Sequence, residues 1–251
     1  MAVVEGSQGR NVMDLKSRIE HYQALEKYRG KPLIVYATST RPGVGAQMAG
    51  DAVREFIDQI EEVSPGEKDI DILIHSTGGD PLAAWKLMSL VRERFSNVSV
   101  LVPYMAFSAA TIFALGANEI VMHPNASLGP IDPQITVKLP DGKARSFAYE
   151  DVASFLRFLY EEVKITDQPH TASVVDRLFS AVDPVVVGAA RRASELSSSV
   201  GERLLSMHMT GADGQQKAKK IATDLNKSFF AHADAVSLTR ARELKLQIAE
   251  D

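Results

Sequence analysis

The fold of this chain is decided by residues 71–134, which begin DILIHSTGGD (71–80), continue VSVLVPYMAFSAATIFALGANEIVMH (98–123) and end PNASLGPIDPQ (124–134). The order of residue types predicts strand, Gly-Gly turn, helix, strand, small-residue helix, strand and a loop rich in proline and glycine. Continuous apolar strands that alternate with helices predict a parallel sheet buried on both faces. The loops after its strands, 77–79, 104–108 and 124–133, should meet at one edge.

The flanking sequence predicts further elements on both sides of this stretch. Residues 32–38 (PLIVYAT) predict another buried strand, and apolar residues at three- and four-residue spacing predict helices over 11–29 and 50–63. On the C-terminal side, residues 135–149 predict a β-hairpin with its turn at Asp141 and Gly142. Helices are expected over 150–163, 167–180, 184–205, 216–230 and 237–246, with a break at 211–215.

The composition is that of a globular protein with a sizeable core. The 251 residues fit one large α/β domain or a domain with an appendage, and 45% of them are hydrophobic. The net charge of -4 does not indicate a nucleic-acid or membrane-surface partner. The absence of cysteine excludes disulfides and thiolate chemistry. No signal-peptide core, membrane span or dense metal-ligand motif is present, so we expect a cytoplasmic protein without metal or cofactor.

Ser108 is the leading candidate for a nucleophile. It begins the predicted small-residue helix, whose dipole favours developing negative charge, and Ala109 and Ala110 leave room for a substrate carbonyl. The turn at Gly78 and Gly79 follows the neighbouring strand, where free backbone N–H groups can hold an oxyanion. The alternative is structural, because a serine can also bond back to a carbonyl or pack as a small residue.

Two strings carry a family resemblance: HSTGGDPLAAW (75–85) and MAFSAATIFALGANEIVMHPNASLGPIDPQI (105–135). They resemble the Clp protease/crotonase superfamily, and within it the serine dehydrogenase proteinase family, which is similar to signal peptide peptidase A. The similarity covers residues 32–133 and resumes near 231–248. It implies an α/β fold of stacked ββα units with a parallel sheet and an α-helical C-terminal extension. We expect an N-terminal helix (1–30), a Clp/crotonase-like core (31–134), a hairpin and helical region (135–230), and a segment that returns to the core (231–251).

The resemblance also implies a catalytic triad in the chain order Ser, Asp, His. Carried onto this sequence, Ser108 is the nucleophile, Asp132 orients the histidine, and His232 takes the serine proton. Gly78, Gly79 and Ala109 form the implied oxyanion hole. The alternatives are that Asp132 caps a turn and that His232 is a solvated helix-end histidine.

Other residues compete for the role of base. His75 and His123 follow predicted strands near the site, and we interpret His75 as mainly structural. A Ser–Lys dyad, as in signal peptide peptidases, would need a buried lysine with a lowered pKa. Lys138, Lys143 and Lys164 lie at suitable chain distances, but their polar neighbours favour surface positions.

Three functions remain open at this point. The first is a serine hydrolase, most simply a peptidase that acts on peptides or proteins through an acyl-enzyme on Ser108. The second is a crotonase-like acyl-CoA enzyme that uses the same oxyanion geometry, and the third is a non-catalytic assembly protein. Because superfamily relatives form rings or trimers, the resemblance also implies a homo-oligomer.

Overall fold

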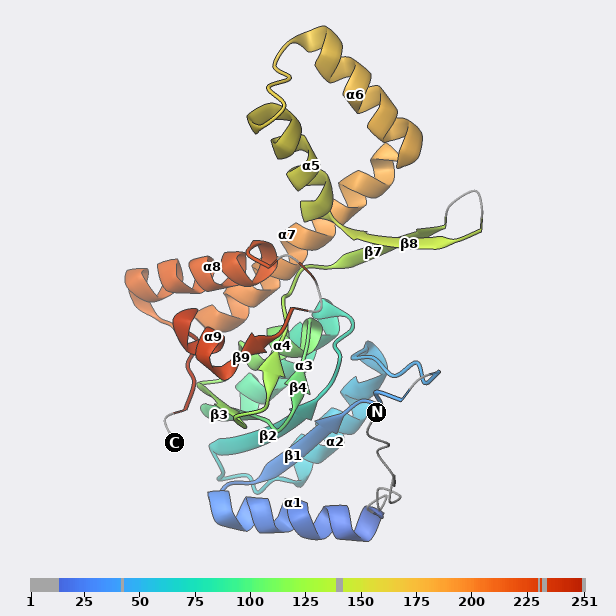
Figure 1. Cartoon of the computed structure of the whole chain (residues 1–251). Coiled ribbons are helices and arrows are strands. Elements are labelled where there is room, and N and C mark those ends of the chain that lie inside the picture. The colour runs from blue at the N-terminus through green and yellow to red at the C-terminus, as the bar shows by residue number, and fades with distance from the viewer. Residues whose placement is uncertain (1–13, 42, 139–141, 230, 232–233, 250–251) are drawn as a thin grey trace, which may run out of the picture.

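The computed structural model describes residues 14–41, 43–138, 142–229, 231 and 234–249. At its centre lies a parallel sheet with strand order β1-β2-β3-β5 (Figure 1). The strands are β1 (Leu33–Ala37), β2 (Asp69–His75), β3 (Asn97–Val102) and β5 (Glu119–Met122). They are linked through α2 (Val53–Glu62), α3 (Pro81–Arg94) and α4 (Ala109–Ala114), with the short turn η1 (Gly50–Ala52) before α2. The predicted α/β fold with a parallel sheet is confirmed.

The sheet is fully buried on one face only, which corrects the expectation of two buried faces. The strand order advances in one direction, so right-handed crossovers place α2, α3 and α4 on the same face. That face carries the core residues Ile72, Ile74 and Val100. On the opposite face Leu73 and Val121 are only half-buried.

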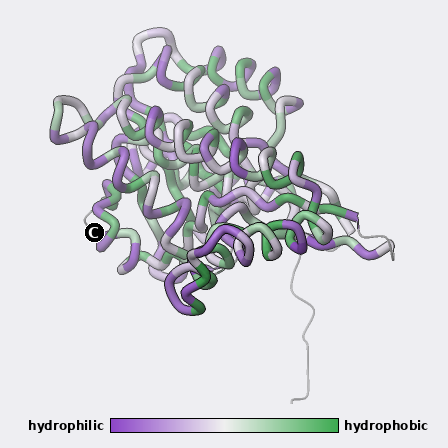
Figure 2. Tube along the Cα trace, turned by 90° about the horizontal axis from the view of Figure 1, so that it is seen from above, coloured by the Kyte–Doolittle hydropathy of each residue, from purple (hydrophilic) through white to green (hydrophobic). Residues whose placement is uncertain are grey.

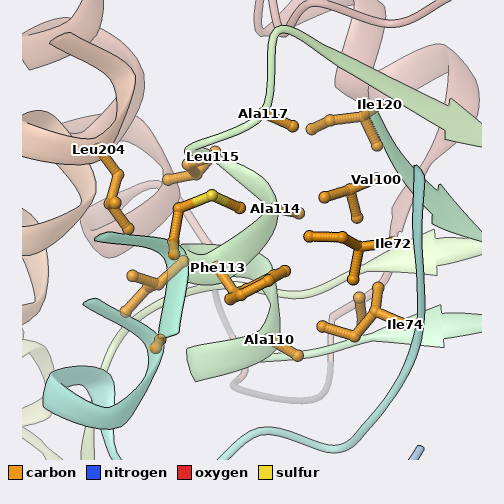
Figure 3. Packing of buried hydrophobic residues seen from close by; sticks show 14 of the residues in the cluster. Ile72, Ile74, Val100, Ala110, Phe113, Ala114, Leu115, Ala117, Ile120 and Leu204 are labelled. Carbon is orange, nitrogen blue, oxygen red and sulfur yellow. The ribbon is translucent and has the colours of Figure 1, made fainter. Parts of the chain in front are cut away.

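The core of the molecule surrounds α4. Ala110, Phe113 and Ala114 of this helix lie toward strand residues such as Ile72 and Val100, whereas Leu115 lies toward Leu204 (Figure 3). All six residues of α4 are buried, as the small-residue pattern predicts. Ser108, which was predicted to begin this helix, lies outside it as the N-cap.

A second, smaller sheet joins distant parts of the chain beside the nucleophile. Its order is β4-β6-β9, with β4 at Met105–Ala106, β6 at Ser127–Leu128 and β9 at Val236–Ser237. A further bridge pairs Ile120 with Ile248. The end of the chain therefore returns to the core, with α9 (Leu238–Glu243) between the two contacts.

An arm projects from the core (Figure 1). It consists of the hairpin β7 (Gln134–Lys138) and β8 (Ala144–Ala148), followed by α5 (Tyr149–Glu161), α6 (Gln168–Ala181) and the first part of α7 (Pro184–Ser206). The second part of α7 and α8 (Gly211–Lys227) pack beside the core. Hydrophilic and hydrophobic residues alternate along the helical traces (Figure 2). The predicted hairpin and helices are present, although the predicted turn residue Asp141 lies outside the described residues.

One local prediction was wrong. The predicted break at 211–215 is the first turn of α8, which begins at Gly211. Gly214 is needed there for close packing, because a Cβ atom on it would lie 2.7 Å from the Met209 carbonyl oxygen. Helix α1 (Leu15–Arg29) has no buried residue, so its apolar side chains do not join the core. It is held instead by Arg29, whose Nε lies 2.7 Å from the buried Asp71 carboxylate.

Candidate active site

Ser108 has a strained backbone. Its φ of 52° and ψ of -119° place a non-glycine residue in a region that costs about 1–3 kcal/mol. Hydrogen bonds on both sides hold this conformation: the Phe107 N–H donates to the Ser76 carbonyl at 2.9 Å, and the Ile112 N–H donates to the Ser108 carbonyl at 3.0 Å. Among the described residues, no side chain or backbone group bonds to the Ser108 hydroxyl. The hydroxyl is therefore available for chemistry.

The Gly-Gly turn packs directly against Ser108. Gly78 has a φ of +98°, and a Cβ atom on it would lie 2.5 Å from the Phe107 carbonyl oxygen and 2.7 Å from the Ser108 Cβ. Only glycine allows this approach. The Gly78 N–H donates to Ser76 Oγ at 3.1 Å, and Thr38 Oγ1 donates to the same oxygen at 2.9 Å.

The Gly79 N–H points away from Met48. Its neighbours carry the bonds to Met48: the Met48 N–H donates to the Gly78 carbonyl, and the Asp80 N–H donates to the Met48 carbonyl, both at 2.8 Å. In a parallel bridge, the residue between the two bonded neighbours, here Gly79, points its own N–H and C=O away from the partner strand. Ala109 is the first residue of α4, so its N–H has no acceptor within the helix.

These groups line one pocket of about 270 Å³. Ser108, Ala109, Gly78 and Gly79 all contribute to its wall, so the structure brings together four of the six predicted site residues. The other lining residues are Gln47, Thr77, Pro81, Ile112, Ile131, Pro133, Gln134 and Ser197. The pocket combines a serine hydroxyl with backbone N–H donors, which is the composition needed to attack and stabilise a carbonyl group.

Asp132 is half-buried beside this pocket, between the lining residues Ile131 and Pro133. Its carboxylate accepts a hydrogen bond from Gln134 Nε2 at 2.9 Å. The loop is fixed from the helical side, because Ser197 Oγ of α7 donates to the Ile131 carbonyl and the Ile131 N–H donates to the Leu225 carbonyl at 3.0 Å. His232 lies outside the described residues.

The described histidines have other settings and none of them lines the pocket. His75 stacks on Tyr104 with ring centroids 6.0 Å apart, and burial lowers the pKa of its imidazole. His123 Nδ1 accepts from the Asn125 N–H at 3.2 Å, and His208 Nε2 lies 2.9 Å from the Leu115 carbonyl. The described lysines do not line it either.

Sequence reasoning missed the buried hydroxyls that hold the site together. Thr111 Oγ1 lies 2.7 Å from the Ala106 carbonyl and accepts from the Gly129 N–H at 3.0 Å, so it joins α4 to the loop of Asp132. Ser76 accepts a hydrogen bond from the Gly78 N–H of the Gly-Gly turn, and Ser197 of α7 donates one to the Ile131 carbonyl beside Asp132. The available signal was weak, since only a hydroxyl within an otherwise apolar run marks Thr111.

Two further searches of the described residues gave no candidate. None of their helices combines the length and apolar character needed to cross a membrane. Their histidine and carboxylate side chains form no group of three or more that could hold a metal ion.

Comparison with known proteins found a family model that matches part of the chain. Residues 51–146 match the family model of the ClpP-like SDH-type serine proteinases. The predicted resemblance to the serine dehydrogenase proteinase family is therefore confirmed over this region, which includes Ser108, the Gly-Gly turn and Asp132.

Two curated relatives extend the similarity along the chain. They are the uncharacterized proteins MJ1495 and MJ0137 of Methanocaldococcus jannaschii, 27% and 28% identical over 187 and 185 residues. The alignments cover 74% of this chain but only 54% and 55% of the relatives. The chain thus spans about half the length of the curated relatives it matches.

Two solved structures share the fold. Both are variants of the 1510-N membrane-bound stomatin-specific protease, one with a lysine replaced by alanine in complex with a substrate peptide and one with a serine replaced by alanine. Their TM-scores are 0.51 and 0.52, with 15% and 14% sequence identity. Each comparison covers 88% of this chain, and 76% and 81% of the respective neighbour.

Proposed function

From the premise that residues 51–146 match the ClpP-like SDH-type serine proteinases, we propose that this chain is a serine peptidase acting through an acyl-enzyme on Ser108. The observation that carries the proposal is one pocket lined by Ser108, whose hydroxyl no described residue bonds, and by the backbone of Gly79 and Ala109. A hydroxyl beside two free N–H donors suits acyl transfer.

In the proposed reaction, Ser108 Oγ attacks the carbonyl carbon of a peptide bond as its proton passes to the base. The N–H groups of Gly79 and Ala109 donate to the resulting oxyanion, and the strained turn at Gly78 holds them in place. Collapse of the intermediate breaks the C–N bond, and the leaving amine takes the proton from the base. Water then hydrolyses the Ser108 ester by the same route and releases the acid.

The deciding test is covalent labelling by a fluorophosphonate. The wild-type chain should be labelled, and Ser108→Ala should lose labelling and peptide hydrolysis. Ser180→Ala, an exposed serine on the arm, is the matched control and should keep both. Acyl-CoA binding without labelling would instead favour the crotonase-like function, and a chain that shows neither would be a non-catalytic assembly protein.

We propose His232 as the base and Asp132 as the group that orients it. His232 precedes β9 by four positions, and β9 belongs to the same small sheet as β4, which ends two residues before Ser108. This connection supports a position near the nucleophile. The lysine variant among the neighbours of similar fold gives a reason to test lysines as well.

A kinetic comparison separates the two kinds of base. His232→Ala should lower kcat/KM by about 10²–10⁴-fold, the usual contribution of a general base. Lys138→Ala, Lys143→Ala and Lys164→Ala should each change it less than about threefold, well within the effect expected of a surface residue. Loss of activity in a lysine variant, with His232→Ala fully active, would assign the base to that lysine.

We further propose that the protein acts on peptides or proteins as a homo-oligomer. The arm supports self-association, because Phe155, Phe158 and Tyr160 of α5 are 40%, 46% and 64% exposed. The cytoplasmic location stays a prediction from composition.

A further inference from the structure

Among the described residues, no strand pairs with the outer edge of β1. Strand order β1-β2-β3-β5 places β1 at the end of the sheet, so it pairs with β2 on one side only. The Asp71 N–H donates to the Pro32 carbonyl at 2.9 Å and the Thr38 N–H donates to the His75 carbonyl at 2.8 Å. Because bonding alternates along a parallel strand, Val35 and Ala37 point their N–H and C=O groups away from β2.

Hollows lie beside this edge, and one of them shares a lining residue with the Ser108 pocket. A hollow of about 920 Å³ is lined by Val35, Ala37 and Ser39 on the strand side and by Gln47 and Gln59 on the other. Gln59 also lines a hollow of about 320 Å³ beside Leu33. Gln47 also lines the Ser108 pocket. We name these three hollows, which share lining residues, the β1 groove.

The charges of the β1 groove have one sign. Asp51 and Glu55 line its central part, and Glu26 and Glu62 line the part beside Leu33. None of the described residues that line the three hollows is a lysine or arginine. Arg41 and Arg54 belong to the same stretch of chain but do not line them.

We propose that the β1 groove binds an extended, lysine- or arginine-containing segment of a polypeptide substrate by strand addition to β1. The outward N–H and C=O groups of Val35 and Ala37 match only another extended backbone, and the carboxylates on the walls select basic side chains. The stretch from Leu33 to Ser39 accommodates about seven extended residues, at about 3.3 Å each. The segment then continues past Gln47, so that the scissile bond lies at Ser108. The identity of the segment as a substrate rests on the proposed peptidase function.

Binding is measured with the Ser108→Ala variant, so that no turnover occurs. The probe is a fluorescein-labelled decapeptide of alternating valine and lysine, and its matched partner carries glutamate in place of lysine. Fluorescence anisotropy should give a Kd at least about tenfold lower for the lysine peptide. Methylation of the lysine peptide's backbone nitrogens at alternate residues should weaken binding about tenfold or more, because strand-addition bonds are lost.

Protein variants test the two contributions separately. Val35→Pro removes an outward N–H that β2 does not use, so it should weaken binding about tenfold without breaking the sheet. Asp51→Asn with Glu55→Gln should bring the two peptides to within about threefold of each other. Asp58→Asn with Glu61→Gln is the control, because it changes net charge equally on exposed residues that do not line the groove.

Equal binding of the methylated and unmethylated peptides, or of the lysine and glutamate peptides, would overturn the proposal. The methylated peptide decides the question even where Val35→Pro fails to fold. Fluorophosphonate labelling of the wild type is scored separately. Labelling without methylation-sensitive binding would reject only the β1 groove, and methylation-sensitive binding without labelling would reject only the peptidase function.

Discussion

Glycine is required at position 78 for two independent reasons. Its φ of +98° suits glycine, and a Cβ atom would collide with the Phe107 carbonyl oxygen, which lies one residue before the nucleophile. The proposed oxyanion donor, the N–H of Gly79, belongs to the next residue in the chain. Packing and the proposed catalysis would therefore depend on the same missing side chain.

Gly78→Ala is expected to lower kcat/KM by about 10²-fold or more, since the proposed donors shift from the oxyanion. It should also lower the free energy of unfolding by about 1–3 kcal/mol. Gly50→Ala is the matched control, because nothing lies within 4 Å of a Cβ atom there. Hydrolysis rates and urea unfolding measure the two effects, and a fully active Gly78→Ala would contradict the proposed oxyanion hole.

At the scale of elements, α7 connects the arm to the site. Ser197 on α7 fixes the carbonyl of Ile131, and Leu204 packs on α4. Just beyond the helix, His208 Nε2 lies 2.9 Å from the Leu115 carbonyl, where neutral imidazole donates a hydrogen bond. Burial lowers the pKa of His208, and the nearby Arg92 charge acts in the same direction.

This contact predicts a pH dependence of stability. A histidine whose folded-state pKa lies below its unfolded value of about 6.5 binds protons more readily when unfolded. Its stabilising contribution is therefore full above about pH 6.5 and is lost as the pH falls. The free energy of unfolding of the wild type, measured with urea, should therefore fall as the pH is lowered from about 7.5 to 5. In His208→Gln this free energy should fall less over the same range. His21 is exposed, so His21→Gln should show the same pH dependence as the wild type.

At the scale of the whole molecule, the arm contributes few residues to the buried core. No residue of α6 is buried, and Val152 is the only buried residue of α5. A projecting hairpin and helices with exposed aromatic side chains are suited to contact with another copy. Self-association through this arm would leave the Ser108 pocket at the core of each copy.

Phe155→Glu with Phe158→Glu should therefore reduce the mass measured by light scattering, because charges replace the proposed apolar contact. The Ser108 site should keep its labelling in the smaller species if the active site is complete within one chain. Arg157→Gln, an exposed polar substitution on the same helix, should leave the mass unchanged. A wild-type chain that is already monomeric would contradict self-association.

The central strands and the nucleophile region could be predicted because their signals are local. The apolar runs at 70–76 and 98–102 define buried strands in any globular context. The Gly-Gly pair marks a turn, and tiny residues after Ser108 mark a buried helix, so the turn and the helix could be predicted without long-range information. The remaining details could not be found in this way.

The sequence by itself determined the alternation of strands and helices, and hence a parallel sheet with its loops at one edge. Only the tertiary structure decided which face of the central sheet is incompletely buried. This depends on the direction of every crossover between the strands. It also decided the strained φ of Ser108, which contacts with Ser76 and Gly78 maintain across the chain. The approach of Ser197 to Ile131 and the free edge of β1 beside Gln47 likewise arise from residues far apart in sequence. Such contacts are long-range, and no local pattern of residue types records them.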